Sequence, residues 1–390
     1  MLRLTPSSLE QYATPNDALA DVVIVAGEAS GDFLAAHLIT SLKRKYPHLR
    51  FGGIAGPLMA HAGCNTWVPQ EKLAVRGYIE VLRHLSELLN IRKRIYERVV
   101  TERPTLFIGV DAPDFNLSLE KKLKLQGIKT IHYVSPSLWA WRPERIERLR
   151  EATDLCLLLF PFEAALYQAA NIPHAVIGHP VCADFNPFPL KRFPAAGETI
   201  KLAMLPGSRQ SELVFHAELF AKTALLLRQR GFRFEVNVPL VHSDHRAHLE
   251  ALFTAIPDIN ATVGNSHDIL KQSHLGLIAS GTASLEAALA NCPHLITYRL
   301  HPWTARAVKK KLTLPYVGLP NVLSKRFVVP ELLQDAATPE NLSQALETLI
   351  TDSWSREQQH QAFEKIFHDL DRPHETLLCE ALAPFLNKAS

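Results

Sequence analysis

Short apolar runs alternate with stretches of helical periodicity along most of this 390-residue chain. Runs of this length, bounded by turn residues, are typical of buried strands. Strands that alternate with helices predict parallel sheets with helical crossovers, which is an α/β fold. The predicted strands are 21–26, 51–54, 106–110, 129–134, 155–160, 201–205, 234–238, 275–279 and 294–298, and the predicted helices are 33–45, 82–101, 145–151, 212–230 and 282–290.

A proline-rich segment, residues 186–197, interrupts this alternation before it restarts at residue 201. Composition shifts of this kind mark linkers, and 390 residues with 47% hydrophobic content are enough for two cores. We therefore expect two similar Rossmann-like domains, over 21–185 and 198–350, that face each other across a ligand-binding cleft. Residues 1–20 are expected to form a flexible leader.

Composition argues against several classes of protein. The net charge is only +3 and the longest basic blocks are short, so nucleic acid is not an expected partner. The five cysteines are scattered and lack C-x-x-C spacing, which argues against a disulfide framework and a zinc site and favours a reducing cytoplasm. No signal peptide is recognisable at the start, and no apolar run reaches the roughly 20 residues of a membrane span. The protein is expected to be soluble or to lie on a membrane surface.

The turn after the predicted strand 106–110 carries two carboxylates, Asp111 and Asp114. In open α/β sheets, ligands bind where the strands end. Pro113 fixes its own φ and biases Ala112 away from the helical region, so we expect both aspartates on a rigid turn that aims a carboxylate. The alternative is that one of them caps the helix that follows, which is the commoner role of such residues.

Two strand–helix junctions in the second half suit an anion. At the first, Gly207 lets a backbone approach a phosphate, the helix start offers free N–H groups, and Arg209 adds a bidentate donor. The simpler alternative is an ordinary connection capped by Ser208.

The second junction is the small-residue turn 280–282, followed by Glu286 one turn inside the helix. A carboxylate there can accept hydrogen bonds from a ribose diol, as in dinucleotide sites, or can simply complement the helix dipole. Two helix starts suited to anions in one domain predict a nucleoside diphosphate.

Three further segments allow two readings each. The junction 27–32 lacks the dinucleotide and P-loop spacings, but its acidic Glu28 and Asp32 suit sugar hydroxyls; an ordinary turn is the alternative. The tryptophans of 132–142 suit a sugar face or a lipid interface if they are exposed, and they are ordinary core residues if they are buried. The amphipathic, basic segment 81–94 is compatible with a membrane surface or with a helix that faces the core.

These motifs together closely resemble the lipid A disaccharide synthase family, from Val22 to the C-terminus. The segments that carry the resemblance are 27–32, 109–115, 131–141, 206–209, 279–283 and 319–321. The resemblance implies a GT-B glycosyltransferase of lipopolysaccharide synthesis in Gram-negative bacteria. Such an enzyme joins UDP-2,3-diacylglucosamine to 2,3-diacylglucosamine 1-phosphate (lipid X), which yields a β-1,6-linked disaccharide 1-phosphate and UDP.

By the same resemblance, Asp111 is the general base, and Glu28, Ser30 and Asp114 lie near the acceptor sugar. The donor side is held by Gly207, Ser208, Arg209, Ser280, Gly281, Thr282, Glu286 and Asn321. Arg209 and the helix starts can offset charge on the departing UDP, so neither a metal nor a cofactor is expected.

The resemblance also assigns places to the domains. The first faces the acceptor and the inner surface of the cytoplasmic membrane, the second binds the UDP-sugar, and helices within 351–390 return toward the first. It further implies a homodimer.

Two other classes of function remain open. A UDP-sugar epimerase can use the same two-domain cleft, but it changes sugar stereochemistry without an acceptor. A non-catalytic lipid-binding or nucleotide-binding protein would keep its role if Asp111 were replaced by asparagine. The acyl chains of the synthase substrates, in contrast, predict an apolar patch near the amphipathic helix of the first half.

Overall fold

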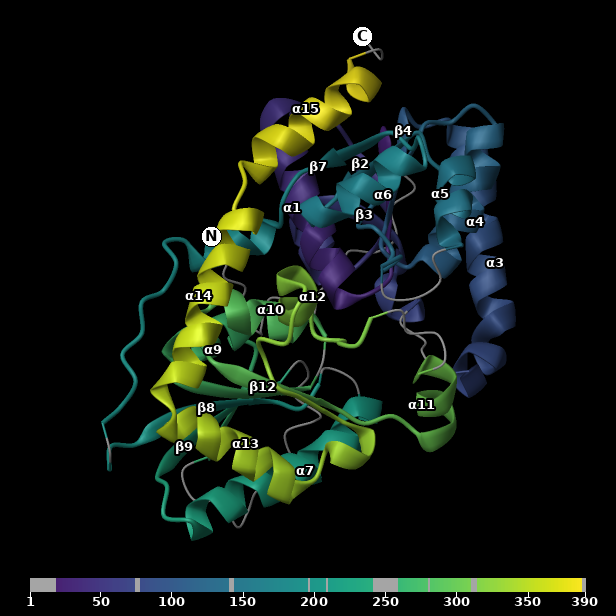
Figure 1. Cartoon of the computed structure of the whole chain (residues 1–390). Helices are drawn as coiled ribbons and strands as arrows, with labels where there is room; N and C mark the ends of the chain where they lie inside the picture. Colours follow the sequence, from purple (N-terminus) through teal and green to yellow (C-terminus); the bar gives the residue numbers. More distant parts are fainter. Residues whose placement is uncertain are drawn as a thin grey trace. The chain divides into compact units, whose positions relative to one another are not determined.

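The computed structural model describes residues 19–73, 78–139, 144–195, 197–207, 210–240, 259–279, 281–309 and 314–387. The chain forms two compact units (Figure 1). Unit 1 comprises Met1–Pro180 and Leu370–Ser390, and unit 2 comprises Val181–Asp369. The chain therefore leaves unit 1 slightly before the predicted boundary at residue 185, and it returns at Leu370.

Within the described residues, unit 1 contains a seven-stranded parallel sheet in the order β3-β2-β1-β4-β5-β6-β7. The central strands β1 and β4 are buried along their whole length, as expected for apolar strands covered by helices on both faces. The strands are β1 (Val22–Ala26), β2 (Phe51–Ala55), β3 (Cys64–Pro69), β4 (Leu106–Val110), β5 (Thr130–Tyr133), β6 (Leu155–Leu158) and β7 (His174–Val176).

Helices cover both faces of this sheet. Helices α1 and α15 pack together, and α4 packs against both α3 and α5 on the other face (Figure 1). The helices of unit 1 are α1 (Ala29–Lys45), α2 (Pro57–His61), α3 (Tyr78–Glu102), α4 (Pro113–Leu125), α5 (Arg145–Ala152), α6 (Ala164–Ala169) and α15 (His374–Leu386).

Unit 2 contains a six-stranded parallel sheet among its described residues, in the order β10-β9-β8-β11-β12-β13. Its strands are β8 (Ile200–Leu205), β9 (Phe234–Leu240), β10 (Ile259–Val263), β11 (Leu275–Ala279), β12 (His294–Tyr298) and β13 (Glu331–Leu333). Helix α13 packs against α7, and α10 packs against α9 and α12. The helices are α7 (Gln210–Gln229), α9 (Ser266–Gln272), α10 (Thr282–Leu289), α11 (Pro302–Lys309), α12 (Leu319–Ser324), α13 (Pro339–Thr351) and α14 (Ser353–Leu370).

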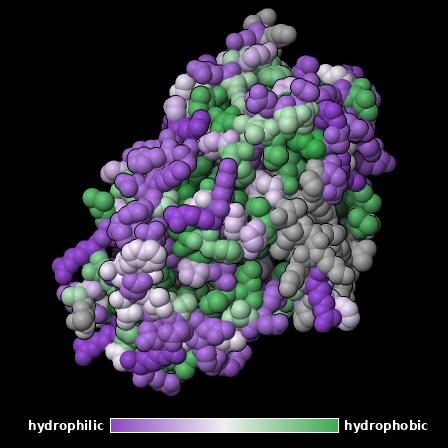
Figure 2. Space-filling model, viewed as in Figure 1, coloured by the Kyte–Doolittle hydropathy of each residue, from purple (hydrophilic) through white to green (hydrophobic). Residues whose placement is uncertain are grey.

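Helix α13 shows how the sequence pattern produces this packing. Leu342, Leu346 and Leu349 recur at helical spacing and are buried, while most of the residues between them are polar. The surface over α13 and α7 is accordingly mostly hydrophilic (Figure 2).

The last two helices belong to different units. Gln359 of α14 accepts a hydrogen bond from the His294 backbone N–H (2.9 Å) and donates one to the His294 carbonyl (3.1 Å), which ties α14 to unit 2. In α15, Glu375 pairs with Arg44 of α1 at 2.6 Å. The segment predicted to return toward the first domain, 351–390, is therefore divided, and only its last part lies in unit 1.

Candidate active site

The order of strands in unit 1 reverses between β1 and β4, which pair in register, with Ala26 opposite Val110. Ligands of open α/β sheets bind at such a switch point, beyond the carboxyl ends of the strands. The turns after the two strands meet there: a Cβ built on Gly27 would lie 3.2 Å from the Cβ of Ala112. The acidic junction 27–32 and the turn that carries Asp111 therefore form one edge of unit 1.

The backbone of the Asp111 turn has an unusual conformation. Asp111 and Ala112 have φ values of 51° and 44°, in the left-handed region that non-glycine residues rarely occupy. The Asp111 N–H donates to the Tyr133 carbonyl (2.9 Å), and the Asn116 side-chain amide donates to the Asp111 carbonyl (2.9 Å). Strain that is held by surrounding bonds in this way is a common property of functional sites.

Helix α4 begins at Pro113, and its N-cap residue is Ala112, which has no capping side chain. Neither aspartate therefore occupies the capping position that the alternative interpretation gave them. Asp111 lies on the turn, as predicted, whereas Asp114 lies in the first turn of the helix. There, Arg145 donates to both of its carboxylate oxygens, at 2.7 and 2.6 Å. Asp114 thus fixes the start of α5, and its side chain is 66% exposed at the edge of the predicted acceptor region.

A buried polar pair that sequence analysis missed lies behind this turn. His132 Nδ1 is 2.9 Å from Glu120 Oε1, and both side chains are fully buried. Burial raises the pKa of Glu120, and the charge and hydrogen bond of His132 oppose that effect. A Cβ on Gly109 would lie 2.1 Å from Glu120 Oε1, so only glycine fits at this position of β4. A glycine and a histidine inside apolar strands were the available signals of this pair.

The junction 27–32 contains one accessible carboxylate, Glu28, and one buried carboxylate, Asp32. Glu28 has extended backbone angles at the N-cap of α1, and Glu28 and Ser30 are both half-buried. Asp32, in contrast, is 2% exposed and accepts backbone N–H groups of Gly56, Leu58 and Met59 at 2.9 to 3.1 Å. Asp32 therefore holds the β2–α2 turn, which leaves Glu28 as the accessible acid of the junction.

The segment after β5 contains a buried acid. Trp139 is half-buried, and its indole N–H donates to Glu163 Oε1 (3.3 Å). Glu163 is 2% exposed, and burial raises its pKa to about 8. Nearby, Tyr167 donates to the Ser135 hydroxyl (2.8 Å). The tryptophan thus belongs to a packed loop at the carboxyl edge of the sheet, and residues 140–143 lie outside the described part of the chain.

Unit 2 has its own switch point between β8 and β11, which pair with Leu205 opposite Ile278. The two predicted anion junctions follow these strands. Gly207 and Gly281 have φ values of 120° and 150°, which residues other than glycine rarely adopt. Ser208, Arg209 and Ser280 lie outside the described residues.

The start of α7 is tied to the end of β12. Tyr298 donates its hydroxyl proton to Glu212 Oε1 (2.9 Å), and the Arg299 N–H donates to His216 Nε2 (2.9 Å). A Cβ on Gly207 would lie 2.4 Å from the Glu212 Cβ, so glycine is required by packing as well as by φ. Three neighbouring strand ends, of β8, β11 and β12, therefore form a connected edge in unit 2.

Glu286 is in the second turn of α10 and faces a histidine that sequence analysis missed. His267 Nε2 is 3.7 Å from Glu286 Oε2, and His267 Nδ1 is 3.0 Å from Asp184 Oδ2. Burial alone would lower the pKa of His267, but its interactions with the two carboxylates, a hydrogen bond to Asp184 and an ion pair with Glu286, outweigh burial and raise the pKa to about 9. At neutral pH, a protonated histidine therefore holds Glu286.

Asn321 is fully buried and uses its whole side chain within the protein. Its amide donates to the Val329 carbonyl (2.8 Å) and to Glu331 Oε1 (2.7 Å), and its oxygen accepts the N–H groups of Val328 (2.7 Å) and Val329 (2.8 Å). An amide has two protons and two lone pairs to offer. The side chain thus fixes the loop before β13 and has no hydrogen-bonding capacity left for a donor sugar.

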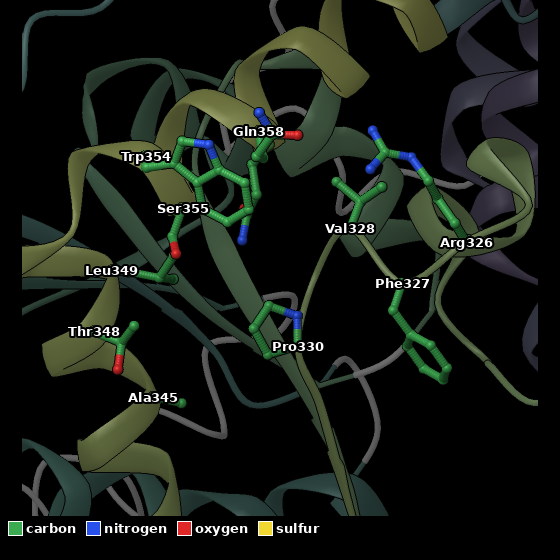
Figure 3. Close-up of a pocket in the computed structure, with 11 residues that line it drawn as sticks. Arg326, Phe327, Val328, Pro330, Ala345, Thr348, Leu349, Trp354, Ser355 and Gln358 are labelled. Atoms are coloured by element: carbon green, nitrogen blue, oxygen red, sulfur yellow. The ribbon is translucent and has the colours of Figure 1, made fainter.

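A cavity of about 320 Å³ lies elsewhere in unit 2, between the α13–α14 junction and the loop before β13 (Figure 3). Trp354 and Gln358 lie on one side of it, and Val328 and Pro330 on the other. It is near the amino ends of β12 and β13, whereas Gly207 and Gly281 follow the carboxyl ends of their strands. It is therefore not part of the predicted donor site.

Comparison with known proteins decides the family. Residues 22–383 match the model of the lipid-A-disaccharide synthetase family, which is most of the chain. The chain belongs to this family. It is therefore an enzyme, a hexosyltransferase of lipid A synthesis.

Individual relatives agree with this assignment. A lipid-A-disaccharide synthase of Thiobacillus denitrificans is 44% identical over 373 residues, which cover 94% of this chain and 100% of the relative. That of Methylobacillus flagellatus is 47% identical over 340 residues, which cover 84% and 89% of the two chains. Identities of this size over most of both chains show membership of the family.

Solved structures show the fold alone. The UDP-GlcNAc 2-epimerase of Neisseria meningitidis bound to UDP-GlcNAc aligns with a TM-score of 0.60 at 13% identity, covering 94% of this chain and 98% of that one. The calicheamicin glycosyltransferase CalG4 aligns with a TM-score of 0.58 at 14% identity, covering 95% and 98%. Two parallel-sheet α/β units of this kind form the GT-B fold, as predicted.

The described residues include neither a membrane-spanning helix nor a metal-binding cluster of side chains. None of their helices is both long and apolar enough to cross a bilayer. In the same part of the chain, no group of His, Cys, Asp and Glu side chains has an arrangement that suits a metal ion.

Proposed function

We propose that this synthetase-family enzyme is an inverting glycosyltransferase that joins UDP-2,3-diacylglucosamine to 2,3-diacylglucosamine 1-phosphate. Its products are the β-1,6-linked disaccharide 1-phosphate and UDP. One observation carries the proposal: in each unit, the predicted site residues other than Asn321 follow the two strands between which the strand order reverses. Asp111 and Glu28 flank that point in unit 1, and Gly207 and Gly281 flank it in unit 2.

In the proposed reaction, Asp111 is the general base. Its carboxylate accepts the proton of the acceptor 6-hydroxyl as that oxygen forms a bond to the anomeric carbon of the donor. The bond from the anomeric carbon to UDP breaks on the opposite face, so a single displacement inverts the configuration. Glu28, Ser30 and Asp114 hold the acceptor sugar. The hydrogen bonds from Asp111 to the Tyr133 carbonyl and from Asn116 to the Asp111 carbonyl fix the turn that aims Asp111.

The donor is proposed to bind at the switch point of unit 2. The N-termini of α7 and α10, with Gly207, Ser208, Arg209, Ser280, Gly281 and Thr282, offset the charge that gathers on the departing diphosphate. Glu286 accepts hydrogen bonds from the ribose hydroxyls. Asn321 supports this side indirectly, through the loop that it holds.

We also propose that the enzyme works as a peripheral protein on the inner face of the cytoplasmic membrane, as a homodimer. Both substrates carry acyl chains, which stay in lipid while the sugars react. On α3, Leu85 and Leu89 are 42% and 45% exposed, at the spacing of one helix face. An apolar helix face of this kind, with basic residues on the same helix, suits a bilayer surface.

Mass spectrometry of the purified protein with both diacylated sugars in detergent tests the reaction. We expect disaccharide 1-phosphate and UDP to form in equal amounts. A donor whose sugar changes configuration without an acceptor would instead show an epimerase. Binding of UDP without turnover of either sugar would show a non-catalytic binding protein.

A further inference from the structure

Positive charge is concentrated in one segment of the sequence of unit 2. Between Glu286 and Glu331 the sequence contains no aspartate or glutamate, whereas the whole chain has 39 of them. The same segment contains seven lysines and arginines, although the net charge of the chain is only +3. These cations are Arg299, Arg306, Lys309, Lys310, Lys311, Lys325 and Arg326. The rest of the chain therefore carries a net negative charge, and this segment stands apart from it.

An exposed tryptophan lies in the middle of this segment. Trp303 is in the first turn of α11 and is 73% exposed. The Arg306 guanidinium lies 5.7 Å from the centre of its ring, close enough for a cation–π contact. Exposure of a large aromatic ring to water is unfavourable. Tryptophan beside basic residues is typical of the interface between lipid headgroups and acyl chains.

Helix α11 lies at the edge of unit 2 that is proposed to bind the donor. Helix α11 follows the carboxyl end of β12, and Figure 1 shows it beyond that end of the strand. The neighbouring strand β11 ends, in register with β12, just before Gly281 of the proposed donor site. The donor keeps two acyl chains in the bilayer, so the edge of unit 2 that binds its nucleotide has to approach the membrane.

We propose that α11 is a membrane-binding helix of unit 2, which inserts Trp303 among the headgroups of an anionic phospholipid surface. Arg306, which lies over the Trp303 ring, binds a lipid phosphate. This inference rests on the proposed function, because only a lipid-linked donor requires unit 2 to approach the bilayer. It adds a second contact to the one proposed for α3 of unit 1.

Cosedimentation of the full-length protein with vesicles tests the proposal. The test variant is Trp303→Ser with Arg306→Glu. The matched control is Trp354→Ser with Arg192→Glu, since Trp354 is 68% exposed and the Arg192 side chain 81% exposed. Both variants lose an exposed tryptophan of unit 2 and change the charge equally. The vesicles contain phosphatidylcholine either alone or mixed with phosphatidylglycerol.

On mixed vesicles, the test variant is expected to bind roughly tenfold more weakly than the native protein, because each cation near an anionic surface contributes about 1 kcal/mol. The control is expected to bind like the native protein, and both variants should keep native activity on detergent-dispersed substrates. A test variant that binds mixed vesicles as tightly as the native protein would overturn the proposal. An equal loss for test and control variants would also overturn it, since the effect would then belong to net charge and not to α11.

Two further measurements separate this inference from the proposed function. The variant Leu85→Ser with Leu89→Ser, on α3, reports on the membrane contact of unit 1. If the native enzyme forms disaccharide and the α3 variant loses vesicle binding while the α11 variant does not, the inference is wrong and the proposed function stands. If the native enzyme forms no disaccharide in detergent, the proposed function itself fails.

Discussion

Glu163 offers a quantitative test of how the loop beside the Asp111 turn is built. Its carboxyl group is 2% exposed and has a pKa of about 8, against an ordinary value of 4.5, because burial disfavours its charged form. The native state therefore keeps a proton that the unfolded state releases. The stabilisation that results is fully present below pH 4.5 and is lost as the pH rises through about 8.

The size of this effect follows from the same two values. Each pH unit between them is worth about 1.4 kcal/mol, so the free energy of unfolding should fall by about 5 kcal/mol across the range. That is a large part of the stability of a typical protein. Glu163→Gln removes the titration and keeps an oxygen that can accept the Trp139 indole N–H. The variant should therefore gain stability relative to the native enzyme as the pH rises.

Urea denaturation of both proteins, at pH values of about 6 and about 9, should show about 3 kcal/mol of this fall, since only the part between pH 6 and about 8 lies within that interval. Glu151→Gln is the control, since that carboxylate pairs with Lys121 and is 56% exposed, and its effect should be small at both pH values. If the native enzyme and Glu163→Gln lose stability in parallel with rising pH, Glu163 is not a buried neutral acid. The account of the packed loop after β5 would then be wrong.

Three other changes test separate parts of the structure. Gly109→Ala would place a methyl group 2.1 Å from Glu120 Oε1 and should lower the free energy of unfolding by about 1–3 kcal/mol; an unchanged urea midpoint would refute this. Asn321→Ala removes buried hydrogen bonds and should cost about 2–5 kcal/mol in the same assay, whereas a surface-like effect below about 0.5 kcal/mol would contradict the burial. His267→Gln should weaken UDP binding, measured by calorimetry, roughly tenfold. The affinity of the native enzyme should fall as the pH rises through about 9, while that of the variant shows no such fall. A native affinity that is constant across this range would show that the charge of His267 does not support the role of Glu286.

The central strands could be predicted from the sequence, and the edge strands could not. The runs 106–110, 275–279 and 294–298 coincide with β4, β11 and β12. The strands that were missed, β3, β7, β10 and β13, are the outer strands of the two sheets. Residues of an edge strand have a neighbour on one side only, so they are partly exposed and their sequences lack continuous apolar runs.

The same distinction applies to the site. Asp111, Gly207 and Gly281 could be located because a local signal, a strand end followed by a turn residue, marks each of them. Contacts between distant segments leave no such signal. His267 and Asp184 are 83 residues apart, and the fold alone brings them together beside Glu286. Asn321 shows the reverse, since its motif pointed to a ligand contact while tertiary burial uses up its side chain.

The rate of disaccharide formation by Asp111→Asn, with UDP binding measured in parallel, tests the central claim most directly. The substitution keeps the size of the side chain and removes its ability to accept a proton. The account predicts that the rate at saturating substrate falls roughly 100-fold or more, as expected for loss of a general base, while the affinity for UDP stays native because the proposed UDP site is in unit 2. A variant with a near-native rate would contradict the assignment of Asp111 as the base.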